Sequence, residues 1–248
     1  MAHDAIPSSG ESCQPAPPGV AFPVELRRYA VGARTLRLWV SDVDHHLDAL
    51  IARGGDDRDI PYWADVWPSA VAVAQHLLAH PEAVGGMRVL ELGAGLGMAG
   101  VAAVLAGAAH VTAADLMPDA LELAEANARL NAVPAERHRT ARFDWRCDAP
   151  PAGTQLLLAA DILYDRAELP HIRGLLTQRL PAGCSFLVAE PSRPVASDFF
   201  DHPDFASWRL EVTHLEGEAG GARQRIRLVH GTRGAAHGGT FPGGASEA

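Results

Sequence analysis

An acidic residue followed by regularly spaced glycines is typical of a loop that binds a nucleotide or a nucleoside-containing cofactor. The stretch VLELGAGLGMAG places Glu91 ahead of Gly93, Gly95 and Gly97. Read from Gly95, the stretch also gives Gly-x-Gly-x-x-Gly ending at Gly100, which is the fingerprint of dinucleotide-binding proteins. Read from Glu91, it gives acid-x-Gly-x-Gly-x-Gly, the pattern of a pocket for S-adenosylmethionine. The two interpretations predict different chemistry.

Two acidic residues, Glu91 and Asp115, bear on this choice. Asp115 follows the loop at the distance where an acidic residue accepts hydrogen bonds from ribose hydroxyls, but both ligands contain adenosine, so Asp115 fits either. Glu91 discriminates, because a carboxylate beside the loop opposes an anionic pyrophosphate bound at the loop amides and helix N-terminus. S-adenosylmethionine instead carries an ammonium and a sulfonium, which a carboxylate favours. The sequence therefore favours S-adenosylmethionine.

Acidic residues at two later strand ends strengthen this interpretation. In FDW, Asp144 can accept from an adenine amino group, and Trp145 can form an aromatic wall beside it. In DILYD, Asp161 and Tyr164 stand three residues apart just past a strand, so both can face the open end of the sheet. A single Asp at a strand end has a structural alternative, since Asp favours strand ends and turns. Several acids at successive strand ends weaken that alternative.

Short apolar runs alternate with amphipathic ones, which predicts β and α units wound into a mostly parallel sheet. The expected strands are 88–92, 110–115, 140–144, 156–161 and 185–190, followed by an antiparallel pair, 208–215 and 223–230. The expected helices are 43–53, 69–80, 97–106, one from Pro118, and 171–180, with a hairpin over 25–40. Open α/β sheets bind ligands at the carboxyl ends of their strands, where the acidic residues fall.

Composition limits the classes of partner. A formal net charge of -9 argues against tight non-specific binding of nucleic acid, which requires clustered basic residues. Three widely spaced cysteines without C-x-x-C indicate reduced thiols, and no export signal or apolar run of about 20 residues is visible, so we expect a cytoplasmic protein without a membrane segment. Pro- and Gly-rich composition predicts flexible segments over 1–22 and 231–248, around one domain over 23–230.

The motifs LELGAGLG, Asp115, FDW and DILYD, in this order, resemble the class I, seven-stranded methyltransferases that use S-adenosylmethionine. Asp161-x-x-Tyr164 resembles the acid-x-x-aromatic signature of a family of protein lysine methyltransferases, while PYWADVWPSA and EPSRP are similar to the branch that methylates the electron transfer flavoprotein β-subunit. The resemblance covers about residues 25 to 230. It implies a single Rossmann-like, doubly wound seven-stranded α/β sheet, mostly parallel with an antiparallel closing strand and helices on both faces.

The resemblance also implies roles for individual residues. Trp67 would pack over the cofactor, although a buried aromatic closing the sheet edge is the alternative. Asp161 would border the methionine part of the cofactor and Tyr164 would shape the lysine channel. Together they would orient the amine, with bulk water able to take its proton. The expected cofactor-binding residues are Trp67, Glu91, Gly93, Gly95, Gly97, Asp115, Asp144, Trp145 and Asp161, with no metal ion.

Several alternatives stay open. The enzyme could methylate another amine, such as a protein N-terminus, a histidine or a small molecule, or the chain could be a non-catalytic partner protein that binds S-adenosylmethionine. A nicotinamide-dependent oxidoreductase is disfavoured by Glu91. We expect Glu190 and Arg193 to form a surface ion pair rather than line the substrate mouth. His76 and His80 lack the third ligand of a metal site. We expect a monomer acting on a protein lysine of a partner, because this chain contains no lysine.

Overall fold

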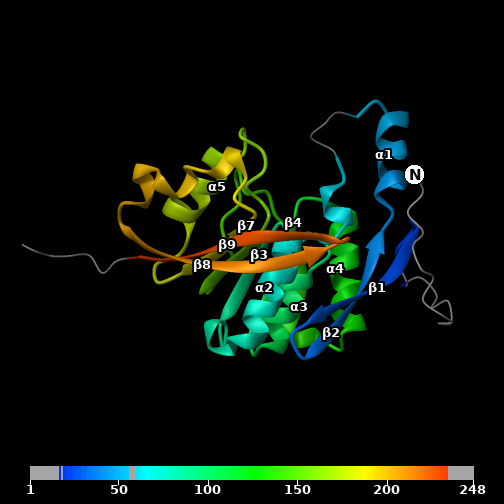
Figure 1. Ribbon diagram of the computed structural model, residues 1–248, viewed down its shortest axis with the longest axis horizontal. Coiled ribbons are helices and arrows are strands. Elements are labelled where there is room, and N and C mark those ends of the chain that lie inside the picture. The colour runs from blue at the N-terminus through cyan, green and yellow to red at the C-terminus, as the bar shows by residue number, and fades with distance from the viewer. Residues whose placement is uncertain (1–16, 18, 56–59, 234–248) are drawn as a thin grey trace, which may run out of the picture.

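A computed structural model describes residues 17, 19–55 and 60–233. Its strands form a two-stranded sheet, β1-β2, and a seven-stranded sheet in the order β5-β4-β3-β6-β7-β9-β8 (Figure 1). The strands are β1 (Val24–Val31), β2 (Arg34–Ser41), β3 (Arg88–Leu92), β4 (His110–Asp115), β5 (His138–Arg142), β6 (Leu156–Ala160), β7 (Ser185–Glu190), β8 (Trp208–Ala219) and β9 (Ala222–Arg233). The helices are α1 (Val43–Ala52), α2 (Pro68–Ala79), α3 (Met98–Leu105), α4 (Pro118–Leu130) and α5 (Leu169–Gly174).

The seven-stranded sheet is parallel from β5 to β7, and β9 is antiparallel to both of its neighbours. The central strands are almost wholly apolar, because parallel strands covered by helices are buried on both faces. Gly220 and Gly221 join β8 to β9 with φ of 56° and 76°, the left-handed backbone that a two-residue hairpin turn requires. This arrangement confirms the predicted doubly wound sheet, with the antiparallel strand placed inside the edge strand.

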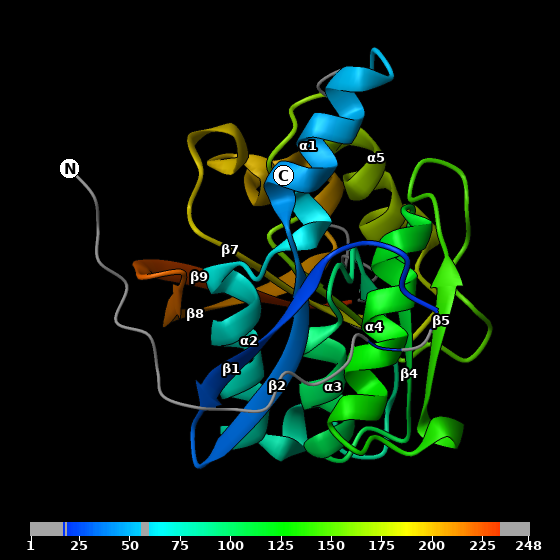
Figure 2. The ribbon, with the colours of Figure 1, turned by 90° about the vertical axis from the view of Figure 1, so that its right-hand side faces the viewer.

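Helices cover both faces of the sheet. Figure 2 looks at the face covered by α2, α3 and α4, with the β1-β2 hairpin crossing over them. Alternation along β3 places Val89 in the core on the α3 face and Leu90 in the core that α5 covers. Glu91 therefore points toward α3. Side chains of this strand reach both cores, while its carboxyl end leads into the glycine loop.

A buried amide joins the hairpin to the glycine loop. The side chain of Asn127, on α4, accepts a hydrogen bond from Trp39 N at 2.7 Å and donates to Trp39 O at 3.1 Å. It also donates to Leu96 O at 2.9 Å, inside the glycine loop. Because buried amides are costly unless satisfied, these three bonds fix the loop relative to α4 and β2.

Most predicted elements agree with the structure to within two residues. The expected strand 140–144 instead spans His138–Arg142, which leaves Asp144 in the following loop. The expected helix 171–180 is divided into α5 and a π-helical turn over Leu175–Arg179. Strand β9 continues to Arg233, past the boundary expected at 231. The predicted flexible segments otherwise lie largely outside the described residues. Within the described part, no helix is long and apolar enough to span a bilayer.

Candidate active site at the carboxyl ends of the strands

The glycine loop after β3 needs its glycines. Gly93, Gly95 and Gly97 have φ of 63°, 50° and 76°, a backbone region that L side chains rarely adopt. A Cβ on Gly93 would lie 2.8 Å from Ile162 Cγ2, and one on Gly97 would lie 3.1 Å from Ala124 Cβ. The loop therefore packs its backbone close to Ile162 and Ala124, and its three glycines form a cradle without side chains.

Glu91 lies behind this loop, against α3. Its side chain is buried, with the residue 3% exposed, and Oε1 accepts a hydrogen bond from Gly100 N at 2.9 Å. Oε2 has no hydrogen-bond partner among the described residues. A Cβ on Gly100 would collide with that carboxylate, so the third glycine of the apparent dinucleotide fingerprint is required by Glu91.

The charge of Glu91 differs from the sequence-based expectation. Burial raises the pKa of this carboxyl to about 8, despite the hydrogen bond from Gly100 N. Without a ligand, the Glu91 side chain is therefore mostly protonated at neutral pH. The sequence predicts an ionised carboxylate here, so that expectation does not hold for the ligand-free protein. A cation in the cradle would favour the ionised form, so the preference for a cationic ligand is conditional on that ligand being present.

Asp115 stands at the end of β4 and braces the loop. Its Oδ2 accepts from Gly95 N at 2.9 Å and its Oδ1 accepts from Met117 N at 3.0 Å. Burial raises its pKa, and the backbone donors work against that rise. Each oxygen of a carboxylate has two acceptor sites, so both oxygens retain capacity for a ribose hydroxyl.

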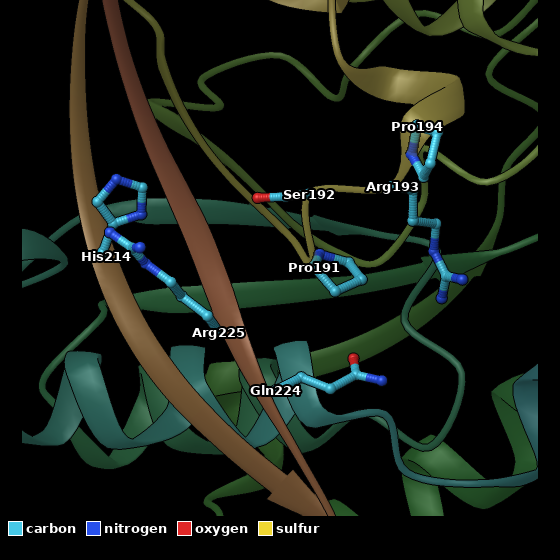
Figure 3. Close-up of a pocket in the computed structure, with 7 residues that line it drawn as sticks. All are labelled: Pro191, Ser192, Arg193, Pro194, His214, Gln224 and Arg225. Atoms are coloured by element: carbon cyan, nitrogen blue, oxygen red, sulfur yellow. The ribbon is translucent and has the colours of Figure 1, made fainter.

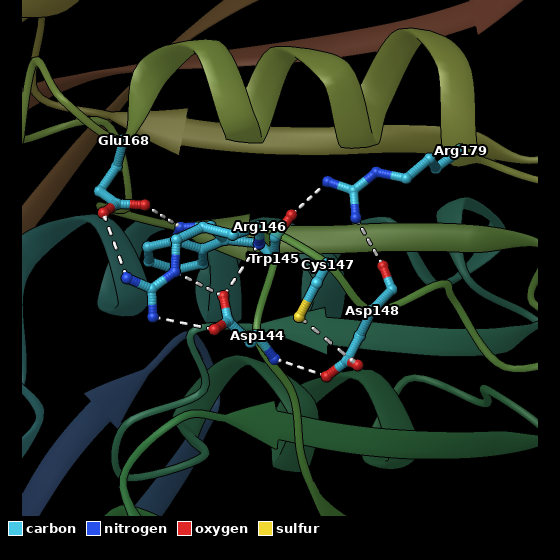
Figure 4. A network of polar contacts seen from close by, with 7 residues as sticks. All are labelled: Asp144, Trp145, Arg146, Cys147, Asp148, Glu168 and Arg179. Carbon is cyan, nitrogen blue, oxygen red and sulfur yellow. Dashed lines mark hydrogen bonds and ion pairs between the residues drawn. The ribbon is translucent and has the colours of Figure 1, made fainter.

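Asp144 and Trp145 belong to the polar network drawn in Figure 4. Arg146 Nε donates to Asp144 Oδ1 and Arg146 Nη2 donates to Oδ2, both at 2.8 Å. The hydrogen bonds from Arg146 lower the pKa of Asp144. Trp145 Nε1 donates to Glu168 Oε2 at 2.6 Å, which fixes the indole beside Gly93. An adenine contact at Asp144 would have to share these oxygens with Arg146.

Asp161 is held in a strained conformation just past β6. It is one of three non-glycine residues with positive φ in the described chain, at 60°, and is 7% exposed. Arg193 donates to its Oδ1 through Nε at 3.0 Å and Nη2 at 2.9 Å, while Ser69 Oγ lies 3.4 Å from Oδ2. Burial raises the pKa of Asp161, and Arg193 opposes that rise. Strained backbone of this kind concentrates at functional sites.

The predicted surface pair between Glu190 and Arg193 is wrong. Glu190 is fully buried, and its Oε1 accepts from Arg227 Nε at 2.7 Å. Only the backbone N of Arg193 reaches Glu190, at 3.0 Å, so the Arg193 side chain is free to pair with Asp161. The cause is topological, because the β7·β9 register places Arg227 directly beside Glu190.

A chain of aromatic side chains leads to Arg193, the partner of Asp161. The ring of Tyr164 lies 5.3 Å from that of Tyr62, which lies 6.1 Å from that of Trp67. Trp67 is half-buried at the start of α2 and donates its indole N–H to Tyr62 O at 2.8 Å. The guanidinium carbon of Arg193 lies 5.9 Å from the Trp67 ring. Trp67 is thus near Asp161 rather than part of the core.

The sequence pattern does not reveal two neighbours of Asp161, Ser69 and Arg193, nor Tyr62, which contacts Tyr164 and Trp67. Tyr62 was passed over inside PYWADVWPSA, although it is 42% exposed, like Tyr164. Ser69 looked like an ordinary residue of α2. Arg193 was assigned to Glu190. Aromatic clustering in PYWADVW was the available signal for Tyr62, whereas the contacts of Ser69 and Arg193 depend on segments far apart in the chain.

Metal ligands do not gather in the described part of the chain. No group of three or more His, Cys, Asp or Glu residues there could hold an ion. His76 and His80 do lie together, with ring centroids 4.8 Å apart. Cys147 and Cys184 are both free thiols.

Comparisons with known proteins agree with this geometry. A family model described as lysine methyltransferase matches residues 58–202. The electron transfer flavoprotein beta subunit lysine methyltransferase of Danio rerio is 35% identical over 143 residues, covering 57% of this chain and 53% of that protein. A protein N-terminal and lysine N-methyltransferase of Eremothecium gossypii is 34% identical over 155 residues, 54% of this chain and 57% of that protein. The chain thus spans about half the length of the curated relatives it matches.

A solved structure supports the fold. A protein of Nostoc punctiforme proposed to be an O-methyltransferase superposes with a TM-score of 0.52 at 16% identity, covering 75% of this chain and 68% of that one. At such low identity the likeness concerns the arrangement of the sheet and helices alone.

Proposed function

The chain belongs to the lysine methyltransferase family, and we propose that it transfers a methyl group from S-adenosylmethionine to the side-chain amine of a lysine on a partner protein. The electron transfer flavoprotein β-subunit is the first partner to test, because a relative is named for that substrate. The single observation that carries the proposal is the placement of Asp161. It is buried, has a left-handed backbone and is bound by Arg193, whose guanidinium carbon lies 5.9 Å from the Trp67 ring. It also stands just past β6, which pairs with β3, the strand that leads into the glycine loop.

The residues present fit the cofactor. The cradle at Gly93, Gly95 and Gly97 would place no side chain between a ligand and the loop backbone, and Asp115 has acceptor capacity left for ribose hydroxyls. The unpartnered Oε2 of Glu91 is a buried acceptor that a nearby positive charge would stabilise in ionised form. S-adenosylmethionine, when bound, supplies a methyl group on a positively charged sulfur.

The remaining residues act on the lysine. A lysine amine, with a reference pKa of about 10.4, must lose a proton before it attacks, and a nearby cation lowers that pKa. The Asp161 carboxylate can accept a hydrogen bond from the amine and fix its direction, after sharing or exchanging its bond to Arg193. The ring faces of Tyr62 and Tyr164 attract a cation, so they favour entry of an ammonium group. The released proton passes to water.

The test is to incubate the protein with methyl-labelled S-adenosylmethionine and the electron transfer flavoprotein β-subunit, and separately with a cell lysate. Peptide mass spectrometry then maps the labelled atom. We expect label on a lysine side chain. Since this chain contains no lysine, the labelled lysine must belong to the partner protein. Asp161→Asn is the matched variant and should lose transfer while still binding S-adenosylhomocysteine. Label confined to small molecules contradicts a protein substrate.

A second candidate acceptor is a protein N-terminus, because one relative is named for both N-terminal and lysine methylation. The same mass mapping separates an α-amine from a side-chain amine. If Asp161→Asn leaves all function intact while the cofactor still binds, a non-catalytic binding role is favoured instead. We include a monomeric state and a cytoplasmic location in the proposal, the latter supported by the free thiols of Cys147 and Cys184.

A further inference from the structure

A pocket of about 600 Å³ lies between the loop after β7 and the β8-β9 hairpin (Figure 3). The loop 191–194, directly after β7, forms one side of it. Strands β8 and β9 form the other side, through His214, Gln224 and Arg225. None of these residues has been given a role in methyl transfer except Arg193, which lies in the loop.

The charge of this pocket is opposite to that of the chain. The whole chain carries a formal net charge of -9, yet no Asp or Glu lines the pocket, while Arg193, Arg225 and His214 do. Arg223, Arg225 and Arg227 alternate along β9. Arg223 donates to Glu216 at 3.1 Å and Arg227 donates to Glu190 at 2.7 Å, whereas Arg225 has no ion-pair partner in the described part of the chain.

The loop that forms the other wall is fixed in place. Ser192 has φ of 55°, and prolines stand one residue before it and two residues after it. The backbone N of Arg193 is bound by the buried Glu190 at 3.0 Å, which holds the loop to β7. Ser192 is exposed and lines the pocket, so its hydroxyl adds a donor to those of Arg225. Figure 3 shows the Arg225 side chain extending from β9 toward His214, while Ser192 belongs to the loop on the other side of β9. The pocket lining thus contains donors from both the loop and the hairpin.

Arg193 connects this pocket to the proposed methyl-transfer site. The residue lines the pocket, while its guanidinium binds Asp161. A lysine that reached Asp161 would carry its neighbours in sequence over the pocket, since an extended chain advances only about 3.3 Å per residue.

We propose that this pocket binds an acidic side chain of the substrate protein, located a few residues from the methylated lysine. This inference rests on the proposed function and adds a specificity determinant to it. An Asp or Glu carboxylate fits a pocket with one unpaired guanidinium, a hydroxyl and an imidazole. A nucleic acid would need a larger basic cluster, which the chain's formal net charge of -9 disfavours.

The experiment uses pairs of short peptides with a central lysine in a Gly, Ser and Ala background. Each pair carries Glu or Gln at one flanking position, and every flanking position is tested in turn. The full chain, Arg225→Gln, Arg225→Glu and Arg209→Gln are compared by kcat/KM. Glu216 lies opposite Arg225 in the β8·β9 register and is bound by Arg223, so a change at Arg223 would release a carboxylate beside the pocket. Arg209→Gln is therefore the matched control, because Arg209 is an exposed arginine of β8 that pairs with Glu211 and does not line the pocket. Calorimetry with S-adenosylhomocysteine checks that each variant retains its cofactor site.

We expect Glu to raise kcat/KM about fivefold over Gln at one or two adjacent positions, as for an exposed ion pair, and the ratio to fall as salt rises. Arg225→Gln should bring that ratio toward one, Arg225→Glu should invert it, and Arg209→Gln should keep it. If peptides are methylated with no preference for Glu at any position, the proposed role of the pocket is wrong and the proposed function stands. The same conclusion follows if the preference for Glu survives Arg225→Gln. Absence of lysine methylation in every peptide and protein tested overturns both.

Discussion

Arg193 donates two hydrogen bonds to a single oxygen of Asp161, at 2.9 and 3.0 Å. The pair joins a loop after β7 to the end of β6, and only the arginine is appreciably exposed. Because burial alone would push Asp161 toward its neutral form, the guanidinium keeps it available as an acceptor. The same contact means that an incoming lysine meets a carboxylate already paired with a cation.

Replacing Arg193 by Gln should shift the pH dependence of methyl transfer. Without the guanidinium, the pKa of Asp161 rises further above its usual value, so the carboxylate is lost at a higher pH as the solution is acidified. We expect about tenfold lower kcat/KM at neutral pH, with partial recovery as pH increases. Arg193→Lys, which keeps the charge, should retain more of the neutral-pH rate. Superimposable pH profiles of Arg193→Gln and the natural protein would exclude this role.

Replacing Glu91 by Gln should stabilise the ligand-free protein at alkaline pH. The pKa of Glu91 is raised in the folded state to about 8, so its contribution to stability is fully present below the pKa of the unfolded chain and is lost as pH rises toward 8. The difference in free energy of unfolding between Glu91→Gln and the natural protein should therefore widen from about pH 5 to pH 8, reaching on the order of a few kcal/mol. Urea unfolding at several pH values measures it, and a constant gap counts against a buried neutral carboxyl.

The same substitution should separate two ligands that differ in charge. S-adenosylmethionine carries a sulfonium that S-adenosylhomocysteine lacks, and only a nearby cation favours ionised Glu91. Glu91→Gln should then weaken binding of S-adenosylmethionine more than binding of S-adenosylhomocysteine, by about threefold to tenfold. Isothermal titration calorimetry gives both affinities. Equal losses would mean that Glu91 acts through the loop geometry alone.

Replacing Gly100 by Ala should destabilise the protein by about 1–3 kcal/mol, because the new methyl group collides with the buried Glu91 carboxylate. The double variant Gly100→Ala with Glu91→Ala should lose less than the sum of the single changes. Gly174→Ala is the control, since that helical glycine has open space around it, and should be neutral or stabilising. Chemical denaturation compares the free energies of unfolding. Similar effects at the two glycines would refute the packing argument.

Replacing Tyr164 by Phe should leave most activity, whereas Tyr164→Ala should lower kcat/KM about tenfold or more. Burial raises the pKa of Tyr164 to about 12, so the phenol is neutral and cannot serve as the base. Its ring lies 5.3 Å from that of Tyr62 and is the part proposed to border the lysine path. Steady-state methylation assays test this, with S-adenosylhomocysteine binding as the control. A large loss in Tyr164→Phe would assign the function to the hydroxyl instead.

The sequence by itself determined the features that follow from short segments. The glycine spacing fixes a left-handed loop whose conformation only Gly adopts readily, and the alternation of apolar runs fixes five parallel strands. Asp115 is the last residue of β4, which determines its position at the edge of the sheet. Its hydrogen-bond partners Gly95 and Met117 lie in the neighbouring loops.

Tertiary structure alone decided which charges meet. Glu190 and Arg193 are close in sequence, which predicts an ion pair between them. Because β9 lies beside β7, Glu190 pairs with Arg227 instead, and the side chain of Arg193 pairs with Asp161. Likewise, Glu91 became a partly unpartnered carboxyl because α3 packs over it. Ion pairing and pKa depend on distance and burial between segments remote in the chain, which a local sequence pattern does not contain.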